Sequence, residues 1–191
     1  MVMKNTLKNL VFTLALLLLG LPAWAAGPAN VYKVRIAKME LWNGSAWVTV
    51  FEGTSTAIDI ASVNSGALAG QFLSGISVPD GTYTQCRVTA SQIFNIKGND
   101  GSGRYTTATI GGNGGCVYSA VAANEAECAI TITSTITPQT TTFSSPITAA
   151  SGVFSHKIRV SFDVSASIEY NAGADEIFPA APTTTVTAIK I

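Results

Sequence analysis

The chain has 191 residues, of which 47% are hydrophobic and only 12% are charged, and its eleven basic side chains balance eleven acidic ones. Disordered chains combine low hydrophobicity with high charge, so this composition predicts a folded protein. A chain without net positive charge lacks the main source of affinity for nucleic acid or an anionic membrane. We therefore expect neither of them as the main partner.

The first 25 residues predict a secretory signal peptide. Two lysines precede an apolar run at residues 10–21, and small residues then form a cleavage site that ends at Ala25. The apolar run is shorter than the roughly 20 residues of a membrane-spanning helix, and no second run follows it. We expect residues 26–191 to be one exported domain without a membrane span, located outside the cell, on its surface or in the periplasm.

Residues 31–42 and 47–51 predict a β-hairpin. The alternation of apolar side chains changes parity inside the first segment, as a β-bulge near residues 37–38 would produce. A turn at residues 43–44 joins the two strands. Trp42 and Trp47 flank this turn. We expect at least one of them to fill the core, whereas exposure of both would favour a ligand-binding module.

The middle of the chain predicts further short strands separated by turns. Residues 56–60 alternate briefly, and residues 61–75 have no clean period. A turn at residues 79–81 opens a strand whose expected inward face is Thr84, Cys86, Val88 and Ala90, with Tyr83 covering the entrance. The next expected strands are residues 105–110, 117–121 and 128–136. On the last of these, Ile130, Ile132 and Ile136 should face the core.

Residues 97–103 predict a polar loop between these strands. Asn99 and Asp100 lie in it, but no further carboxylates follow at the spacing of a calcium loop. We expect a solvated turn, and we expect residues 139–152 to be a connection.

Residues 157–170 have the clearest pattern in the chain, because apolar and polar side chains alternate without exception. A strand of this length would need long partners or would have to bend and serve two sheets. We expect it to be the central strand of the fold, matched in length by residues 128–136 or by the strand that starts at Thr82.

Three cysteines remain in a compartment that allows disulfides, so one thiol is left over. We favour Cys116 with Cys128, which bracket a short loop that a disulfide would constrain. Pairing of Cys86 with Cys128 stays open, because both side chains are expected to point inward.

In total, eight or nine strands without an amphipathic helix in the exported part predict an all-β fold, a single antiparallel β-sandwich domain. Residues 78–88, VPDGTYTQCRV, resemble exported bacterial β-sandwich domains of the prealbumin-like and immunoglobulin-like kind, in which a Pro-x-Gly-x-Tyr turn leads into a central strand. Residues 33–50 and 58–60 are similar to one family of exported bacterial domains of unknown function. The resemblance implies the sandwich and brings no catalytic residue.

The sequence offers no convergent catalytic or metal-binding set, so we expect no enzyme, no cofactor and no metal. Its only histidine, His156, has no nucleophile motif, and Asp163 lies half a strand away. The carboxylate pairs Asp175 with Glu176 and Glu125 with Glu127 are expected to be solvated loop charges.

Two functions fit these features. The leading hypothesis is a structural or adhesive exported protein, including a fibre or pilus subunit joined to itself or to another surface protein by strand addition. The expected assembly strand is the chain end, with Val186, Ala188, Ile189 and Ile191. The alternative is a module that binds carbohydrate or another surface ligand through Trp42 and Trp47.

Overall fold

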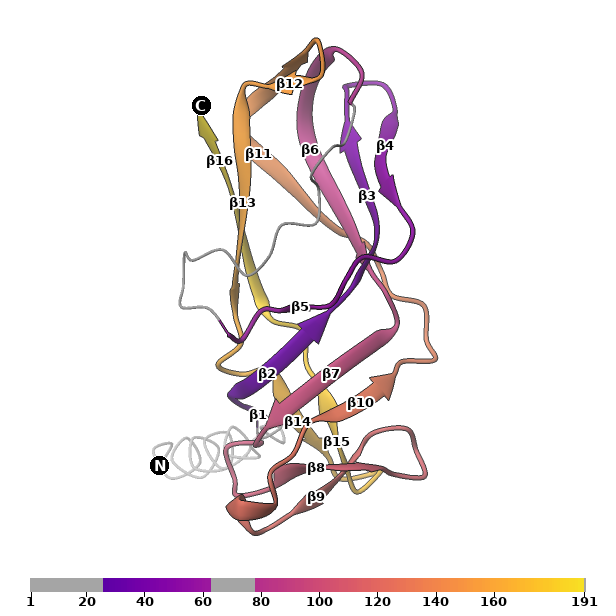
Figure 1. The fold of residues 1–191 in the computed structure, drawn as a ribbon, viewed down its shortest axis with the longest axis vertical. Helices are drawn as coiled ribbons and strands as arrows, with labels where there is room; N and C mark the ends of the chain where they lie inside the picture. Colours follow the sequence, from indigo (N-terminus) through magenta and orange to yellow (C-terminus); the bar gives the residue numbers. More distant parts are fainter. Residues whose placement is uncertain (1–25, 63–77, 191) are drawn as a thin grey trace, which may run out of the picture.

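The computed structural model describes residues 26–62 and 78–190 and shows an elongated molecule built almost entirely of strands (Figure 1). The predicted signal peptide, most of residues 61–75 and Ile191 lie outside the described residues. Within the described part, the only helical element is one 3-10 turn, η1 (Ala122–Asn124), and no helix is long and apolar enough to cross a membrane. The all-β prediction is confirmed. Sixteen strand segments replace the expected eight or nine, because several are short or interrupted.

The strands form four antiparallel sheets. The first sheet has the order β1-β14-β15-β9-β8, with strands Ala26–Gly27, Ile168–Asn171, Glu176–Pro179, Cys116–Ser119 and Tyr105–Ile110. The second has the order β10-β7-β2-β5, with Cys128–Thr131, Ile93–Gly98, Ala29–Val34 and Ile58–Asp59. The third has the order β12-β11-β6-β3-β4, with Val153–Phe154, Gln139–Ala150, Gly81–Ala90, Ile36–Trp42 and Trp47–Glu52. The fourth contains β13 (His156–Asp163) and β16 (Thr183–Lys190).

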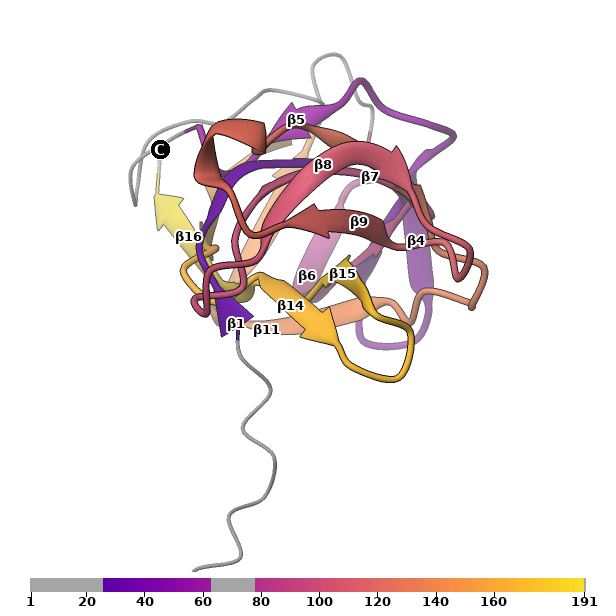
Figure 2. The same ribbon diagram turned by 90° about the horizontal axis from the view of Figure 1, so that it is seen from below.

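Two hydrophobic cores are stacked along the molecule. The first core lies between the first two sheets and includes Tyr32, Ile96, Cys116, Ile130, Ile168 and Ile177. The second core is formed by the inner face of the third sheet, with Leu41, Tyr83, Cys86 and Ile147, against Ile158 of β13 and Ala188 of β16. Seen from below, β8, β9, β14 and β15 lie at the near end, opposite to β12 (Figures 1 and 2).

Six passages of described residues join the two cores. β2 continues into β3 after a break at Arg35, and β6 continues into β7 after Ser91 (Figure 1). The Ser91 N–H donates a hydrogen bond to the Arg35 carbonyl at 2.7 Å, so these two passages are bonded to each other where they cross. The other four lead from β4 to β5, from β10 to β11, from β13 to β14 and from β15 to β16.

The expectation of one central strand at residues 157–170 is wrong. The alternating segment bends after Asp163, whose Oδ1 accepts the N–H of Ser165 at 2.9 Å, and it serves two sheets as β13 and β14. Its partner along β13 is β16, not residues 128–136 or β6. Apolar and polar side chains alternate on both sides of the bend because the segment packs on a core before and after it. Ile158 packs on the second core, and Phe162 and Ile168 pack on the first.

The β3–β4 hairpin agrees with the sequence pattern, whereas β6, β10 and β11 differ from it in part. The hairpin is confirmed, with a register shift between Ile36 and Lys38 where the bulge was expected. Residues 139–150, expected as a connection, form the 12-residue strand β11. β10 ends at Thr131, although Ile132 and Ile136 still pack against the first core. On β6 the buried residues are Tyr83 and Cys86 and not Thr84, because the register shifts where β6 meets β11.

Candidate functional site

Trp42 and Trp47 form an aromatic pair at the end of the β3–β4 hairpin. They lie directly opposite each other in the strand register, with ring centroids 5.4 Å apart and planes inclined by 53°. The turn between them is held by the Asn43 side chain, whose Oδ1 accepts the N–H groups of Ser45 and Ala46. A turn fixed in this way limits how far the two rings can move apart.

The two indoles belong to a continuous outer face of the third sheet. Directly paired residues of neighbouring strands point to the same face, so the register places Trp47, Trp42, Gln85 and Thr142 in one row across four strands. The next row contains Thr49, Glu40, Arg87 and Thr140. We call these eight residues the tryptophan face. Neither Trp42 nor Trp47 is buried, and neither belongs to a core, so the expectation that at least one fills the core is wrong.

A charged cluster lies beside the indoles. The Arg87 guanidinium is 4.3 Å from the centre of the Trp47 ring, and its Nε donates to Glu40 Oε2. Lys38 Nζ lies 3.2 Å from Glu40 Oε1. Glu40 is only 5% exposed, and the hydrogen bond from Arg87 is the largest cause that lowers the pKa of its carboxyl. The cluster therefore holds Arg87 over the indole and leaves its charge compensated.

Polar groups for a ligand accompany the aromatic surface. Gln85 is half-buried and Thr49, Thr140 and Thr142 are exposed, and none of these side chains has a hydrogen-bond partner among the described residues. The sequence pointed to the two tryptophans but missed Gln85, Arg87, Glu40 and Thr142. Only the strand register shows that these four residues belong to the tryptophan face, because it places residues from distant segments side by side.

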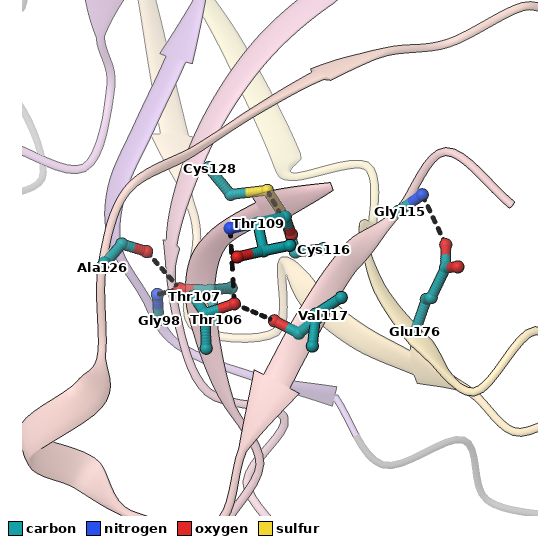
Figure 3. The surroundings of a disulfide bond; sticks show 10 residues. All are labelled: Gly98, Thr106, Thr107, Thr109, Gly115, Cys116, Val117, Ala126, Cys128 and Glu176. Carbon is teal, nitrogen blue, oxygen red and sulfur yellow. Dashed lines mark hydrogen bonds between the residues drawn. A yellow bond between two sulfur atoms is a disulfide. The ribbon is translucent and has the colours of Figure 1, made fainter. Parts of the chain in front are cut away.

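The predicted Cys116–Cys128 disulfide is present, with both residues fully buried in the first core (Figure 3). The alternative pairing of Cys86 with Cys128 is not formed, because Cys86 lies in the second core. Burial raises the pKa of the Cys86 thiol to about 12. Close to the disulfide, Thr106 Oγ1 donates to the Ala126 carbonyl and accepts the N–H of Gly98 (Figure 3).

The expected assembly strand is β16, and it pairs with β13 of the same chain over its whole length, from Thr183 opposite Asp163 to Lys190 opposite His156. Ala188 packs against the second core, whereas Ile189 is 37% exposed. Val186 lies opposite Val160, and Ile191 is outside the described residues.

Of the carboxylates expected to be solvated loop charges, Asp175 is exposed in a turn, whereas Glu176 is buried. Glu176 begins β15, and one of its oxygens accepts the N–H of Asn113 at 2.8 Å. The other accepts the N–H of Gly115 at 2.7 Å (Figure 3). Asp100 is fully buried and ion-paired with Arg104, with 2.8 Å between Oδ2 and Nη1. Glu127 pairs with Lys33, and Glu125 accepts a hydrogen bond from Asn30.

The single histidine contacts its neighbour. His156 Nδ1 lies 2.8 Å from Ser155 Oγ, which also accepts the N–H of Thr148. Among the described residues, no carboxylate bonds to this histidine and no group of His, Cys, Asp and Glu is placed to hold a metal ion. A groove of about 490 Å³ lies where β6 meets β7, lined by uncharged residues that include Thr89, Gln92, Ile93 and Thr131.

Comparison of the chain with family models, with curated proteins and with solved structures gives no match in any of the three.

Proposed function

We propose that this protein is a non-catalytic exported adhesive module that binds carbohydrate on the tryptophan face. The observation that supports this is the row of two indoles, one amide and one hydroxyl on the outer surface of a single sheet. Indole rings offer an apolar surface to the C–H groups of a sugar, and amide and hydroxyl groups exchange hydrogen bonds with its hydroxyls.

The charges on this face favour an uncharged ligand. Glu40 is paired with both Arg87 and Lys38, and Lys38 also lies opposite Glu52 in the register. A ligand carboxylate or phosphate would have to compete with Glu40 for Arg87, and leaving the buried Glu40 carboxylate without this partner is costly. We therefore expect neutral glycans to bind better than acidic ones.

A glycan array probed with the purified protein tests this proposal. We expect binding to neutral oligosaccharides, and we expect Trp42→Ala and Trp47→Ala each to raise the Kd by about tenfold or more, because truncating a central aromatic contact typically costs about 2 kcal/mol. Trp42→Phe should lose less, since a ring is kept. Ile110→Ala serves as the control, because Ile110 is 46% exposed on β8 at the other end of the molecule.

Absence of glycan binding by the folded protein contradicts the proposal. Binding that both tryptophan variants leave unchanged does so as well, because the ligand would then sit elsewhere. Circular dichroism of each variant ensures that a loss of binding is not a loss of fold.

The second candidate is a fibre subunit joined by strand addition. It is favoured by the fourth sheet, which has only two strands in the described part of the chain. Because β16 is paired with β13 of the same chain, donation of β16 to a neighbouring subunit would require the loss of that pairing. Electron microscopy tests this candidate: filaments that vanish when residues 186–191 are deleted support it, and an unchanged monodisperse protein contradicts it.

A further inference from the structure

Within the part of the chain that the structure describes, β13 has one hydrogen-bonded neighbour. All eight of its residues pair with β16, and no other strand or loop of residues 26–62 and 78–190 supplies a backbone partner to its second edge. β16, in contrast, also lies close to β11. A strand edge without partners presents a row of N–H and C=O groups that another strand can use.

The residues of β13 divide cleanly between its two faces. Ile158, Val160 and Phe162 are half-buried on the face that packs on the cores. Lys157, Arg159 and Asp163 are exposed on the other face. The apolar row is symmetric about Val160, and the outer row has a positive charge three residues before Val160 and a negative charge three residues after it.

This arrangement makes β13 complementary to itself. In an antiparallel pair centred on Val160, Lys157 of one copy lies opposite Asp163 of the other, and this contact occurs twice. On the core-facing side, Ile158 lies opposite Phe162 and Val160 opposite Val160. Oppositely charged and apolar cross-strand pairs each stabilise a sheet by about 0.2–1 kcal/mol.

We propose that a second copy of this chain docks on the free edge of β13, so that the two fourth sheets become one sheet of order β16-β13-β13-β16. The contact is isologous and closes as a dimer, unlike a head-to-tail fibre. It involves the fourth sheet and not the tryptophan face, so it does not depend on the carbohydrate proposal.

The register centred on Arg159 and the other strand of this sheet are less suitable. Centring the pair on Arg159 would place Arg159 opposite itself, and like charges in direct opposition destabilise a sheet. β16 carries a single charged residue, Lys190, so a β16–β16 pair has no charge complementarity. The occupant is therefore a second β13, and we commit to the register centred on Val160. The register centred on Ser161 would instead place Arg159 opposite Asp163, and the Arg159→Asp variant distinguishes the two.

Sedimentation equilibrium of the full chain over a wide concentration range tests the proposal. We expect a monomer–dimer equilibrium for the wild type. Lys157→Asp creates two Asp–Asp oppositions and should raise the dimer dissociation constant by about tenfold or more. Combining Lys157→Asp with Asp163→Lys restores opposite charges and should recover dimerisation.

Two further variants control for charge and for the bend. Arg159→Asp changes the same charge on the same face but lies opposite Ser161, so it should weaken the dimer much less than Lys157→Asp. Asp163→Asn keeps an acceptor for the Ser165 N–H while removing the charge, so it should weaken the dimer with the bend intact. A monomer at all concentrations, a dimer insensitive to Lys157→Asp, or a double variant that stays dissociated would overturn the proposal.

Discussion

Asp100 is the most confined charged residue of the described chain. Its side chain is fully buried, Oδ1 accepts the N–H groups of Ser102 and Arg104, and Oδ2 accepts from the Arg104 guanidinium. The same guanidinium lies 3.9 Å from the centre of the Tyr170 ring, so the loop is tied to the end of the first core. The loop at residues 97–103, expected to be a solvated turn, is in this respect an anchored part of the fold.

This environment predicts a pH-dependent contribution to stability. Burial by itself raises the pKa of the Asp100 carboxyl, but the hydrogen bonds from Arg104 and Ser102 outweigh it and the net shift is downward. A lowered pKa in the folded state means that the stabilisation is present above the ordinary value near 4 and is lost as the pH falls through the folded value. Asp100→Asn should therefore cost about 2 kcal/mol at neutral pH and much less in strong acid. Urea unfolding at several pH values measures it, and an equal cost at every pH contradicts the assignment.

Gly111 and Gly112 offer a matched pair of substitutions. A Cβ on Gly111 would lie 2.2 Å from Glu176 Oε1, whereas a Cβ on Gly112 would have nothing within 4 Å. Gly111→Ala should displace the carboxylate that accepts the Asn113 and Gly115 N–H groups, at a cost of about 1–3 kcal/mol. Gly112→Ala should be near neutral. Thermal unfolding compares the two, and equal Tm values for both variants would show that Glu176 does not constrain this loop.

At the level of elements, the disulfide joins β9 to β10 inside the first core, whereas Cys86 belongs to β6 in the second. Thiol alkylation followed by mass spectrometry, without a reducing agent, tests whether Cys116 and Cys128 are paired and Cys86 is the free thiol. We expect no labelling of the folded protein, because Cys86 is buried and its thiol pKa is raised to about 12. After unfolding we expect one label, on Cys86. Labelling of Cys116 or Cys128 under these conditions would contradict the pairing.

The sequence pattern predicted those elements whose signals are local. β8 is found at the expected residues, the β3–β4 hairpin follows from its Asn-Gly turn, and the disulfide follows from a short loop between two cysteines. Each of these depends on neighbours in the chain. Strand alternation and turn chemistry therefore suffice to place them.

The elements that were missed depend on contacts between distant segments. Residues 157–170 keep their alternation through a bend, so periodicity could not reveal that β13 and β14 belong to different sheets. β11 contains Pro146 and a register shift, which hide its strand character, and it is ordered by pairing with β6. For the same reason, only two of the eight residues of the tryptophan face were predicted, since β6 and β11 contribute Gln85, Arg87 and Thr142 through the register.

For the whole molecule, the two cores should unfold together. Both are connected by β2 with β3, β6 with β7 and β13 with β14, and the first two passages share the Ser91–Arg35 hydrogen bond. Ile147→Ala in the second core and Ile177→Ala in the first should each cost about 2–5 kcal/mol and lower a single common transition. Calorimetry measures this. Two separate transitions, each moved by one variant only, would show that the halves unfold independently.

Carbohydrate binding on the tryptophan face is tested most directly by the indole N–H signals of Trp42 and Trp47 in two-dimensional NMR, during titration with the strongest neutral glycan from the array. We predict that both indole signals shift progressively and saturate together with the Gln85 side-chain amide. Signals that shift only around the groove near Thr89 and Thr131, with both indoles unmoved, would contradict the proposed site.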